Sequence, residues 1–85
     1  MVGYVADLGH VVASNVRAER ARRRWRQSDL ADALGWDVGT VGHLETGRRD
    51  VRAADLPQLC RALGITLDRL LQDADPDDVA ALGLG

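Results

Sequence analysis

Apolar residues recur at helical spacing along most of the chain, whereas the alternation typical of strands is weak. Leu8, Val12 and Val16 stand four residues apart, and a polar, arginine-rich stretch follows them. Apolar positions spaced by three or four residues mark one face of a helix. The pattern therefore predicts a first helix over residues 7–23, with Asp7 as its N-cap.

Two short helices follow, separated by a turn that contains Gly35. Their apolar positions predict helices over 27–34 and 38–45, and Asp37 is a good N-cap for the later one. A glycine directly after the last apolar residue ends a helix in a left-handed cap. Gly35 takes that place after the earlier helix, and Gly47 ends the later one.

The chain after residue 52 predicts two more helices. Asp55 and Gln58 have the spacing of a capping box, and Gly64 ends the helix that they begin. Thr66 caps a fifth helix, and residues 77–82 are candidates for a short extra helix before a Gly-Leu-Gly end that is expected to fray. The predicted fold class is therefore all-α, with five short helices.

The charges are distributed unevenly along the chain. The formal net charge is −2, and all 11 basic residues are arginine. Residues 16–52 hold nine arginines and six acids, a balance of +3, whereas residues 63–85 hold one arginine and five acids, a balance of −4. A basic segment of this kind favours contact with nucleic acid in spite of the acidic sum.

Composition argues against several other classes of protein. Cys60 is the only cysteine, so no internal disulfide forms and a reducing compartment is expected. No apolar run is long enough for a membrane span and no signal peptide is visible, which favours the cytoplasm. His10, His43 and Cys60 lack the spacing of a metal site, and no nucleophile–base set indicates an enzyme. No cofactor or metal is expected.

The most informative unit covers residues 27–47. Its two short helices are joined by a tight turn, and Ala31 must be small because the later helix crosses there. Gly35 supplies the positive φ that the turn requires. Trp25 and Trp36 flank the earlier helix and are expected in the core. A helix-turn-helix of this form places its second helix in the major groove of DNA.

The motifs of this unit continue into the second half of the chain. They are Q-x-x-L-A-x-x-L-G from Gln27, L-E-x-G-R from Leu44 and L-P-x-L-x-x-A-L-G-I-T-L-D-x-L-L from Leu56. In this order and spacing they resemble the lambda-repressor-like, Cro/C1-type helix-turn-helix domains over residues 12–71. The resemblance implies a compact five-helix domain that binds double-stranded DNA.

The resemblance also implies roles for individual residues. Arg20 and Glu45 match a pair that forms a structural salt bridge between the first and third helices. Gln27 matches a residue that grips a DNA phosphate at a helix N-terminus. The arginines expected at the phosphates are Arg24, Arg26, Arg48 and Arg49, and Arg52 is the candidate for the minor groove.

The third helix is the expected reading helix, and its side chains offer few groups to bases. The positions expected to face DNA are Val38, Gly39, Thr40, Gly42 and His43. Val38 offers only an apolar contact to a thymine methyl, and Gly39 offers only close approach of the backbone. Specificity is therefore expected from His43, Thr40 and the shape of the DNA.

Three leucines near the end of the domain have two alternative uses. Leu67, Leu70 and Leu71 either close the core or present an apolar patch to a second subunit, and the resemblance favours a homodimer. The helix-turn-helix domain is expected over residues 1–72. The acidic residues 73–85 are expected to be either a dimerisation extension or a loose tail in solvent, and the tail is also the candidate site for a protein partner.

The sequence therefore favours a cytoplasmic regulator, encoded by a bacterium or a phage, that binds DNA and represses transcription as a homodimer. Two alternatives remain open. One is an antitoxin that represses its own operon and engages a basic toxin through the acidic tail. The other is a helix-turn-helix that has lost base reading and acts as a protein-interaction module.

Overall fold

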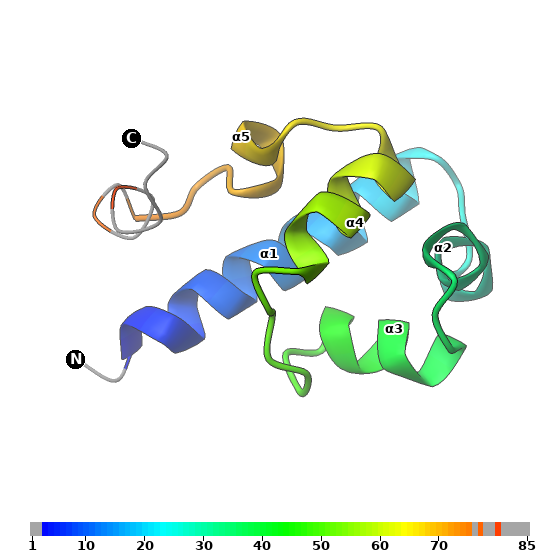
Figure 1. Ribbon diagram of the computed structural model, residues 1–85, viewed down its shortest axis with the longest axis horizontal. Helices are drawn as coiled ribbons and strands as arrows, with labels where there is room; N and C mark the ends of the chain where they lie inside the picture. Colours follow the sequence, from blue (N-terminus) through cyan, green and yellow to red (C-terminus); the bar gives the residue numbers. More distant parts are fainter. Residues whose placement is uncertain (1–2, 76, 78–79, 81–85) are drawn as a thin grey trace.

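Five helices make up the part of the chain that the computed structural model describes, which is residues 3–75, 77 and 80. They are α1 (Gly3–Arg22), α2 (Gln27–Leu34), α3 (Val38–Glu45), α4 (Asp55–Leu63) and α5 (Leu67–Leu70). In Figure 1, α1 runs along the molecule behind α4, α2 and α3 lie together at one end, and α5 lies along the upper side. The described residues contain no strand, and the all-α prediction is confirmed.

The start of α1 differs from the prediction. The expected N-cap, Asp7, lies inside the helix, which begins at Gly3. Nothing between these two residues stops a helix, because the segment contains neither proline nor a second glycine. Asp7 therefore does not mark the start of α1, although aspartate favours N-caps, because the residues before it are also helical.

The connections between helices turn through left-handed residues. Gly35 has a φ of 71° and Gly64 a φ of 66°, which confirms both predicted glycine caps. Arg24 takes the same conformation after α1, with a φ of 56°, although it carries a side chain. The N–H that follows each turn reaches back to a carbonyl of the preceding helix, as from Trp25 to Arg20 at 3.1 Å. These turns keep the connections short.

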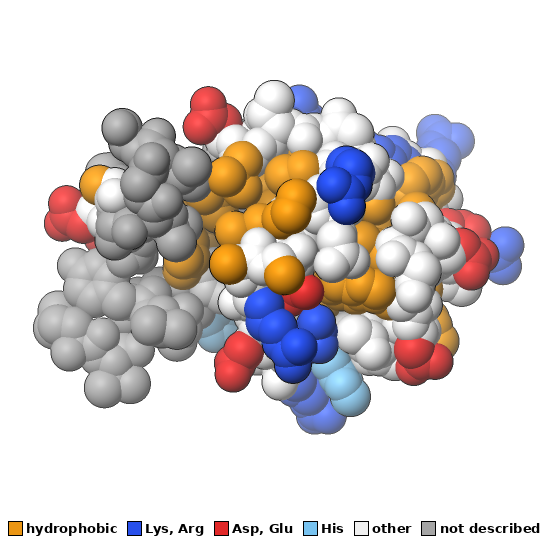
Figure 2. Space-filling view, in the orientation of Figure 1, with side chains coloured by type: hydrophobic (Ala, Val, Ile, Leu, Met, Phe, Trp, Pro, Cys, Tyr) orange, Lys and Arg blue, Asp and Glu red, His pale blue; other side chains and the backbone are white. Residues whose placement is uncertain are grey.

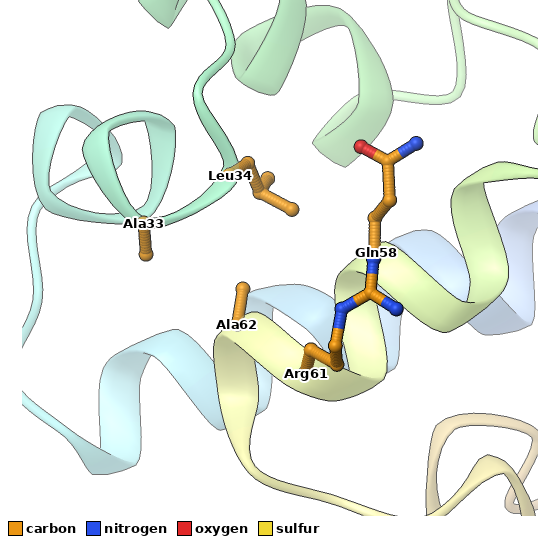
Figure 3. Close-up of a pocket in the computed structure, with 5 residues that line it drawn as sticks. All are labelled: Ala33, Leu34, Gln58, Arg61 and Ala62. Atoms are coloured by element: carbon orange, nitrogen blue, oxygen red, sulfur yellow. The ribbon is translucent and has the colours of Figure 1, made fainter.

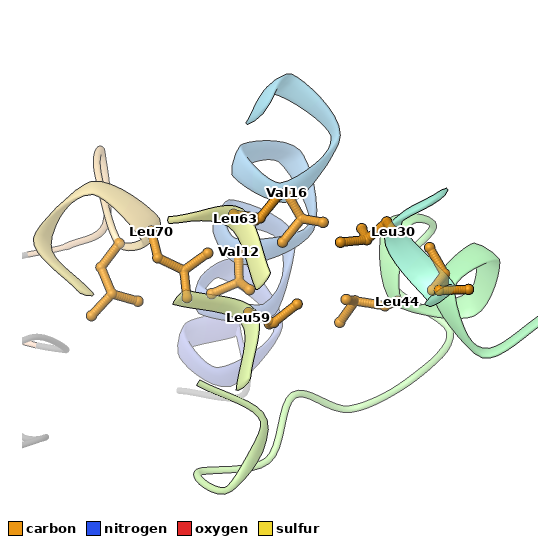
Figure 4. Packing of buried hydrophobic residues seen from close by; sticks show 10 residues of the cluster. Val12, Val16, Leu30, Leu44, Leu59, Leu63 and Leu70 are labelled. Carbon is orange, nitrogen blue, oxygen red and sulfur yellow. The ribbon is translucent and has the colours of Figure 1, made fainter. Parts of the chain in front are cut away.

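The core lies between α1, α4 and the α2–α3 pair (Figure 4). All five helices contribute side chains that are fully buried, namely Val12, Val16, Leu30, Val41, Leu44, Leu59 and Leu70. Burial of each such side chain is worth about 1.5–3 kcal/mol. Trp25 and Trp36 are half-buried and pack against this cluster, so they cover its edge rather than fill its centre.

α5 closes the core at the end of the domain. Leu70 is fully buried and Leu71 is 5% exposed, so these two leucines do not form the apolar patch that was the alternative for them. Leu67 is half-buried. The hydroxyl of Thr66 accepts the N–H of Arg69 at 3.3 Å, which is the predicted cap. The further helix predicted over 77–82 lies mostly outside the described residues.

The start of α4 also differs from the prediction. Asp55 is the first residue of the helix rather than its N-cap, and it is buried. Its carboxylate accepts the N–H of Arg52 at 3.0 Å. Gln58 donates its amide to the carbonyl of Ala54 at 3.3 Å. The predicted capping box is therefore wrong, and the acid instead fastens the preceding loop to the helix start.

A buried acid ties α1 to α5. Glu19 is 5% exposed. Its carboxylate pairs with Arg22 at 3.0 Å, Arg23 at 2.9 Å and Arg69 at 2.6 Å. Burial opposes ionisation of this carboxyl, but hydrogen bonds from Arg23 and Arg69 and the positive charges of Arg69 and Arg22 outweigh burial and lower its pKa. Part of the basic run is thus used inside the fold.

We expect acid to weaken the fold through Glu19. Its pKa in the folded chain lies below the ordinary value of 4.5, so the ionised carboxylate stabilises the native state above that pH, and this contribution is lost as the pH falls through the folded pKa. Glu19→Gln should lower Tm at neutral pH and flatten the decline of Tm on acidification. Asp68→Asn removes an exposed acid of α5 and is the matched control. Equal acid sensitivity of the Glu19 variant and the unaltered chain would contradict the assignment.

Candidate nucleic-acid interface

α2 and α3 are held close together by a small residue and a tight turn. Ala31 is 3% exposed within the packed pair, and its carbonyl accepts the N–H of Trp36 at 2.9 Å. Gly35 provides the left-handed turn between the helices. Both helices have the bounds that their apolar pattern predicts, so the chain forms the expected helix-turn-helix.

α3 has a buried face and an open face. Its buried residues are Val41, Leu44 and Glu45. Among the predicted reading positions, those that are exposed are Val38, Gly39 and His43, and those that are half-buried are Thr40 and Gly42. The predicted reading positions thus lie outside the buried stripe of the helix, within reach of a ligand that approaches the open face.

The first turn of α3 combines an apolar side chain with open backbone. Val38 is 48% exposed, more than the other large apolar side chains that the structure describes. Asp37 caps the helix by accepting the N–H of Gly39 at 3.2 Å. A Cβ at Gly39 would stand 3.1 Å from that same carboxylate oxygen. Glycine at this position therefore leaves room for the cap and keeps the backbone of the first turn accessible.

A buried ion pair fixes α3 to α1. Glu45 is 1% exposed, and Arg20 donates Nε to its Oε2 at 2.7 Å and Nη2 to its Oε1 at 3.0 Å. These are the two residues that the resemblance pairs. Arg20 also donates to the carbonyl of Trp25 at 2.8 Å, and Arg17 donates to the main-chain carbonyl of Glu45. A bidentate pair fixes orientation as well as distance, so α3 is held in one orientation against α1.

Gln27 belongs to the same network. Its Nε2 donates to Glu45 Oε1 at 3.1 Å, and a Cβ at Gly42 would stand 3.8 Å from its Oε1. The amide therefore lies between α2 and α3, at the N-terminus of α2. The first N–H groups of a helix have no partner inside it, and this end attracts anions. An amide with one N–H engaged keeps its oxygen and its other N–H for further partners.

Four exposed arginines precede or follow the helix pair in the chain. Arg24 lies in the turn after α1, Arg26 directly precedes α2, and Arg48 and Arg52 lie in the loop after α3. The side chain of Arg26 is 87% exposed and stands 3.9 Å from Asp29. Figure 2 shows basic side chains and a histidine together at the lower edge of the molecule, over the end of α3 and the loop that follows it. These side chains are accessible to a polyanion.

Arg49 differs from the other arginines of that loop. Its side chain is 24% exposed, and its Nη2 donates to the buried carboxylate of Asp55 at 3.2 and 3.4 Å. Its guanidinium carbon lies 4.9 Å from the centre of the Trp36 ring, a distance typical of cation–π contact. The sequence predicts Arg49 as a phosphate ligand, and in the structure its guanidinium is engaged by the protein itself.

A shallow hollow lies between α2 and α4 (Figure 3). It is lined by Ala33, Leu34, Gln58, Arg61 and Ala62. These residues include no nucleophile and no pair of acid and base groups, so the hollow lacks the features of a catalytic site. Within the described residues, no group of three His, Cys, Asp or Glu side chains is arranged to hold a metal ion. No helix in that part of the chain has the length and apolar character needed to cross a membrane.

The sequence did not predict the contacts that join the turn before α3 and the loop after α3 to α4. Trp36 Nε1 donates to Gln58 Oε1 at 3.1 Å, and Arg49 pairs with Asp55. The sequence predicted Asp55 as part of the capping box of its own helix, so no pairing of Asp55 with an arginine was expected. One signal was available, since an acid three residues after Arg52 has the spacing at which a side chain accepts the N–H of a helix start.

Comparison with known proteins adds the following findings. A family model described as a helix-turn-helix domain matches residues 12–74. A hypothetical transcription factor of Neisseria meningitidis serogroup B is 32% identical over 65 residues, which are 76% of this chain and 61% of that protein, so the chain spans less than two thirds of that relative's length.

Two solved structures share the fold and part of the sequence. The crystal structure of the hypothetical transcription factor NHTF from Neisseria superposes with a TM-score of 0.73 at 30% identity, over 89% of this chain and 85% of that one. The crystal structure of the clp gene regulator ClgR from C. glutamicum superposes with a TM-score of 0.71 at 27% identity, over 92% of this chain and 94% of that one. The similarity thus covers almost the whole described chain.

We expect Glu45→Ala to destabilise the fold, because it leaves Arg20 without its partner. Loss of one member of a buried pair costs about 3 kcal/mol at the lower end of the usual range, and the lower end applies because the side chain of Arg20 is 21% exposed. Urea denaturation measures the loss. Asp32→Ala changes an exposed acid of α2 and should shift the free energy of unfolding by less than about 0.5 kcal/mol. An unchanged free energy in the Glu45 variant would show that the pair contributes nothing.

Proposed function

The chain belongs to the family of helix-turn-helix domains, and we propose that it is a sequence-specific DNA-binding transcription regulator of the lambda-repressor-like class. One observation carries the proposal. Exposed arginines come directly before α2 and directly after α3, while the inner face of α3 is locked to α1 by the pair of Arg20 and Glu45. A rigid helix with basic flanks suits recognition of DNA, because phosphate contacts position a protein and base contacts give it specificity.

Phosphate contacts come from both sides of α3 in this proposal. Gln27 and Arg26 act at the N-terminus of α2, where main-chain N–H groups add to the attraction for an anion. Arg24 precedes them in the turn, and Arg48 acts from the loop after α3. Exposed guanidinium groups before α2 and after α3 suit the phosphate backbones that border a major groove.

Base contacts come from the open face of α3. Val38 packs against a thymine methyl, and His43 and Thr40 offer hydrogen bonds to base edges. Gly39 and Gly42 let the helix backbone approach the DNA closely. Arg52 enters the adjacent minor groove, where a narrow groove attracts arginine.

We further propose that residues 1–72 form the DNA-binding domain of a homodimeric repressor. Two copies related by a twofold axis place their reading helices roughly 34–36 Å apart, one turn of DNA. Leu67, half-buried on α5, stays the candidate for the subunit contact. Residues 73–85 form an acidic extension for the second subunit or for a protein partner. Such a regulator represses by covering a promoter, and it acts in the cytoplasm of a bacterium, where the genome is accessible.

The experiment that tests this function is a binding selection with random duplex DNA at two salt concentrations. Recovery of a site with twofold symmetry, bound less tightly at higher salt, is the expected result, because release of counterions from neutralised phosphates makes the affinity depend on salt. A selected site without symmetry would retain DNA binding but overturn the dimer. A folded chain that enriches no sequence would overturn base reading and favour the protein-interaction module.

Gly42→Ala should separate stability from DNA binding. Alanine is favoured over glycine inside a helix by about 1 kcal/mol, and the added Cβ would be 3.8 Å from Gln27, an ordinary contact. We therefore expect a higher Tm but affinity for the selected site lower by roughly tenfold, since the methyl group hinders close approach to bases. Gly9→Ala adds a methyl with no atom within 4 Å on α1. This control should raise Tm and leave affinity unchanged. Full affinity in the Gly42 variant would exclude close approach at that position.

A further inference from the structure

We infer that Arg49 is a positioning residue, which joins Trp36 to Asp55 and thereby sets the loop after α3 relative to the start of α3. These three residues form a clamp. The inference rests on the proposed DNA-binding function and deepens it. The clamp sets the spacing between the side chains that read bases and those that bind the DNA backbone.

The clamp holds the turn before α3 from two sides. Trp36 directly precedes Asp37, the N-cap of α3. The guanidinium of Arg49 lies over the Trp36 ring at 4.9 Å, and the ring N–H donates to Gln58 of α4 at 3.1 Å. The first turn of α3, with its exposed Val38, is therefore placed relative to both the loop and α4.

The acid of the clamp also fixes the loop. Asp55 is 3% exposed, and its carboxylate accepts both the Arg49 guanidinium and the main-chain N–H of Arg52 at 3.0 Å. Arg52 is exposed, and Arg48 is exposed beside Arg49. One buried carboxylate thus holds the backbone between two arginines that face outward.

The chemistry of the clamp requires arginine. The Nε of Arg49 is buried and has no acceptor among the described residues, and a buried N–H without a partner is unfavourable. Lysine has no Nε of this kind and would avoid that loss. Its ammonium is a point charge on a flexible stem, however, and it cannot stack flat on an indole and pair with a carboxylate in a fixed plane. Arg49 therefore fixes the orientation of the loop, because its guanidinium stacks on Trp36 and pairs with Asp55 at the same time.

The expected consequence is a loss of discrimination between DNA sequences rather than a general loss of affinity. A displaced loop still attracts phosphates through its charges. The displaced loop no longer contacts the DNA backbone at the position where α3 contacts the correct bases. Phosphate contacts fix the register in which a protein reads bases, so this register is lost. Binding to the specific site therefore suffers more than binding to an unrelated duplex.

The test measures Kd of the full chain for its selected site and for a scrambled duplex across a series of salt concentrations. Asp55→Asn and Arg49→Lys should each lower the ratio of the two affinities by roughly tenfold, the effect of about one lost base contact. The double variant should lose no more than the worse single one, because both changes break one unit. The slope of log Kd against log salt on the scrambled duplex should stay unchanged.

Arg48→Ala is the matched control from the same loop. A residue that only neutralises a phosphate should weaken both duplexes alike and lower the salt slope by about one. If Arg49→Ala gives that same pattern and Asp55→Asn leaves the ratio intact, Arg49 is a phosphate ligand and the inference is overturned. Trp36→Phe keeps an aromatic ring under the guanidinium and gives a milder variant if Asp55→Asn does not fold.

The inference and the proposed function fail in different ways. If the unaltered chain discriminates between duplexes and the Asp55→Asn and Arg49→Lys variants discriminate equally well, only the positioning role is lost. If the unaltered, folded chain shows no salt-sensitive binding to any duplex, the proposed function is overturned and the positioning role falls with it.

Discussion

The bidentate pair of Arg20 and Glu45 is the contact on which the geometry of the interface depends. Its carboxylate is buried at the end of α3, receives two N–H groups of Arg20 and accepts a third from Gln27 at the start of α2. A charge in the interior is unfavourable unless it is paired and hydrogen-bonded. Three helices therefore share one arrangement that satisfies this carboxylate, and the direction in which α3 presents its open face follows from that arrangement.

Buried acids also decide which arginines are available to DNA. The buried acids among the described residues are Glu19, Glu45 and Asp55, and each pairs with at least one arginine. Among these partners, Arg20 and Arg49 are half-buried and Arg69 is exposed, whereas Arg26 and Arg48 are exposed before α2 and after α3. This division reconciles the acidic net charge with a basic interface, because the field near the DNA depends on where charges lie rather than on their sum.

The sequence predicted the elements that are marked by local signals and missed the contacts that join distant segments. The bounds of α2 and α3 agreed with the prediction because Gly35 and Asp37 mark the turn between them. The start of α1 carries no such mark, so its prediction was wrong. The pairing of Glu19 with Arg69 joins α1 to α5, and no periodicity along one helix indicates it. Asp55 has the spacing of a capping box with Gln58, so its pairing with the preceding loop was not predicted.

The sequence of α3 is poorly suited to a helix in isolation. It is eight residues long and contains two glycines, each of which costs about 1 kcal/mol relative to alanine. The helix is instead held at its end by Glu45 and at its start by the turn that Trp36 anchors to α4. Because tertiary contacts supply the stability that the helix itself lacks, the open face does not need good helix formers. Glycines are therefore tolerated on the side that faces DNA in the proposed complex, where they allow the backbone to come close to the bases.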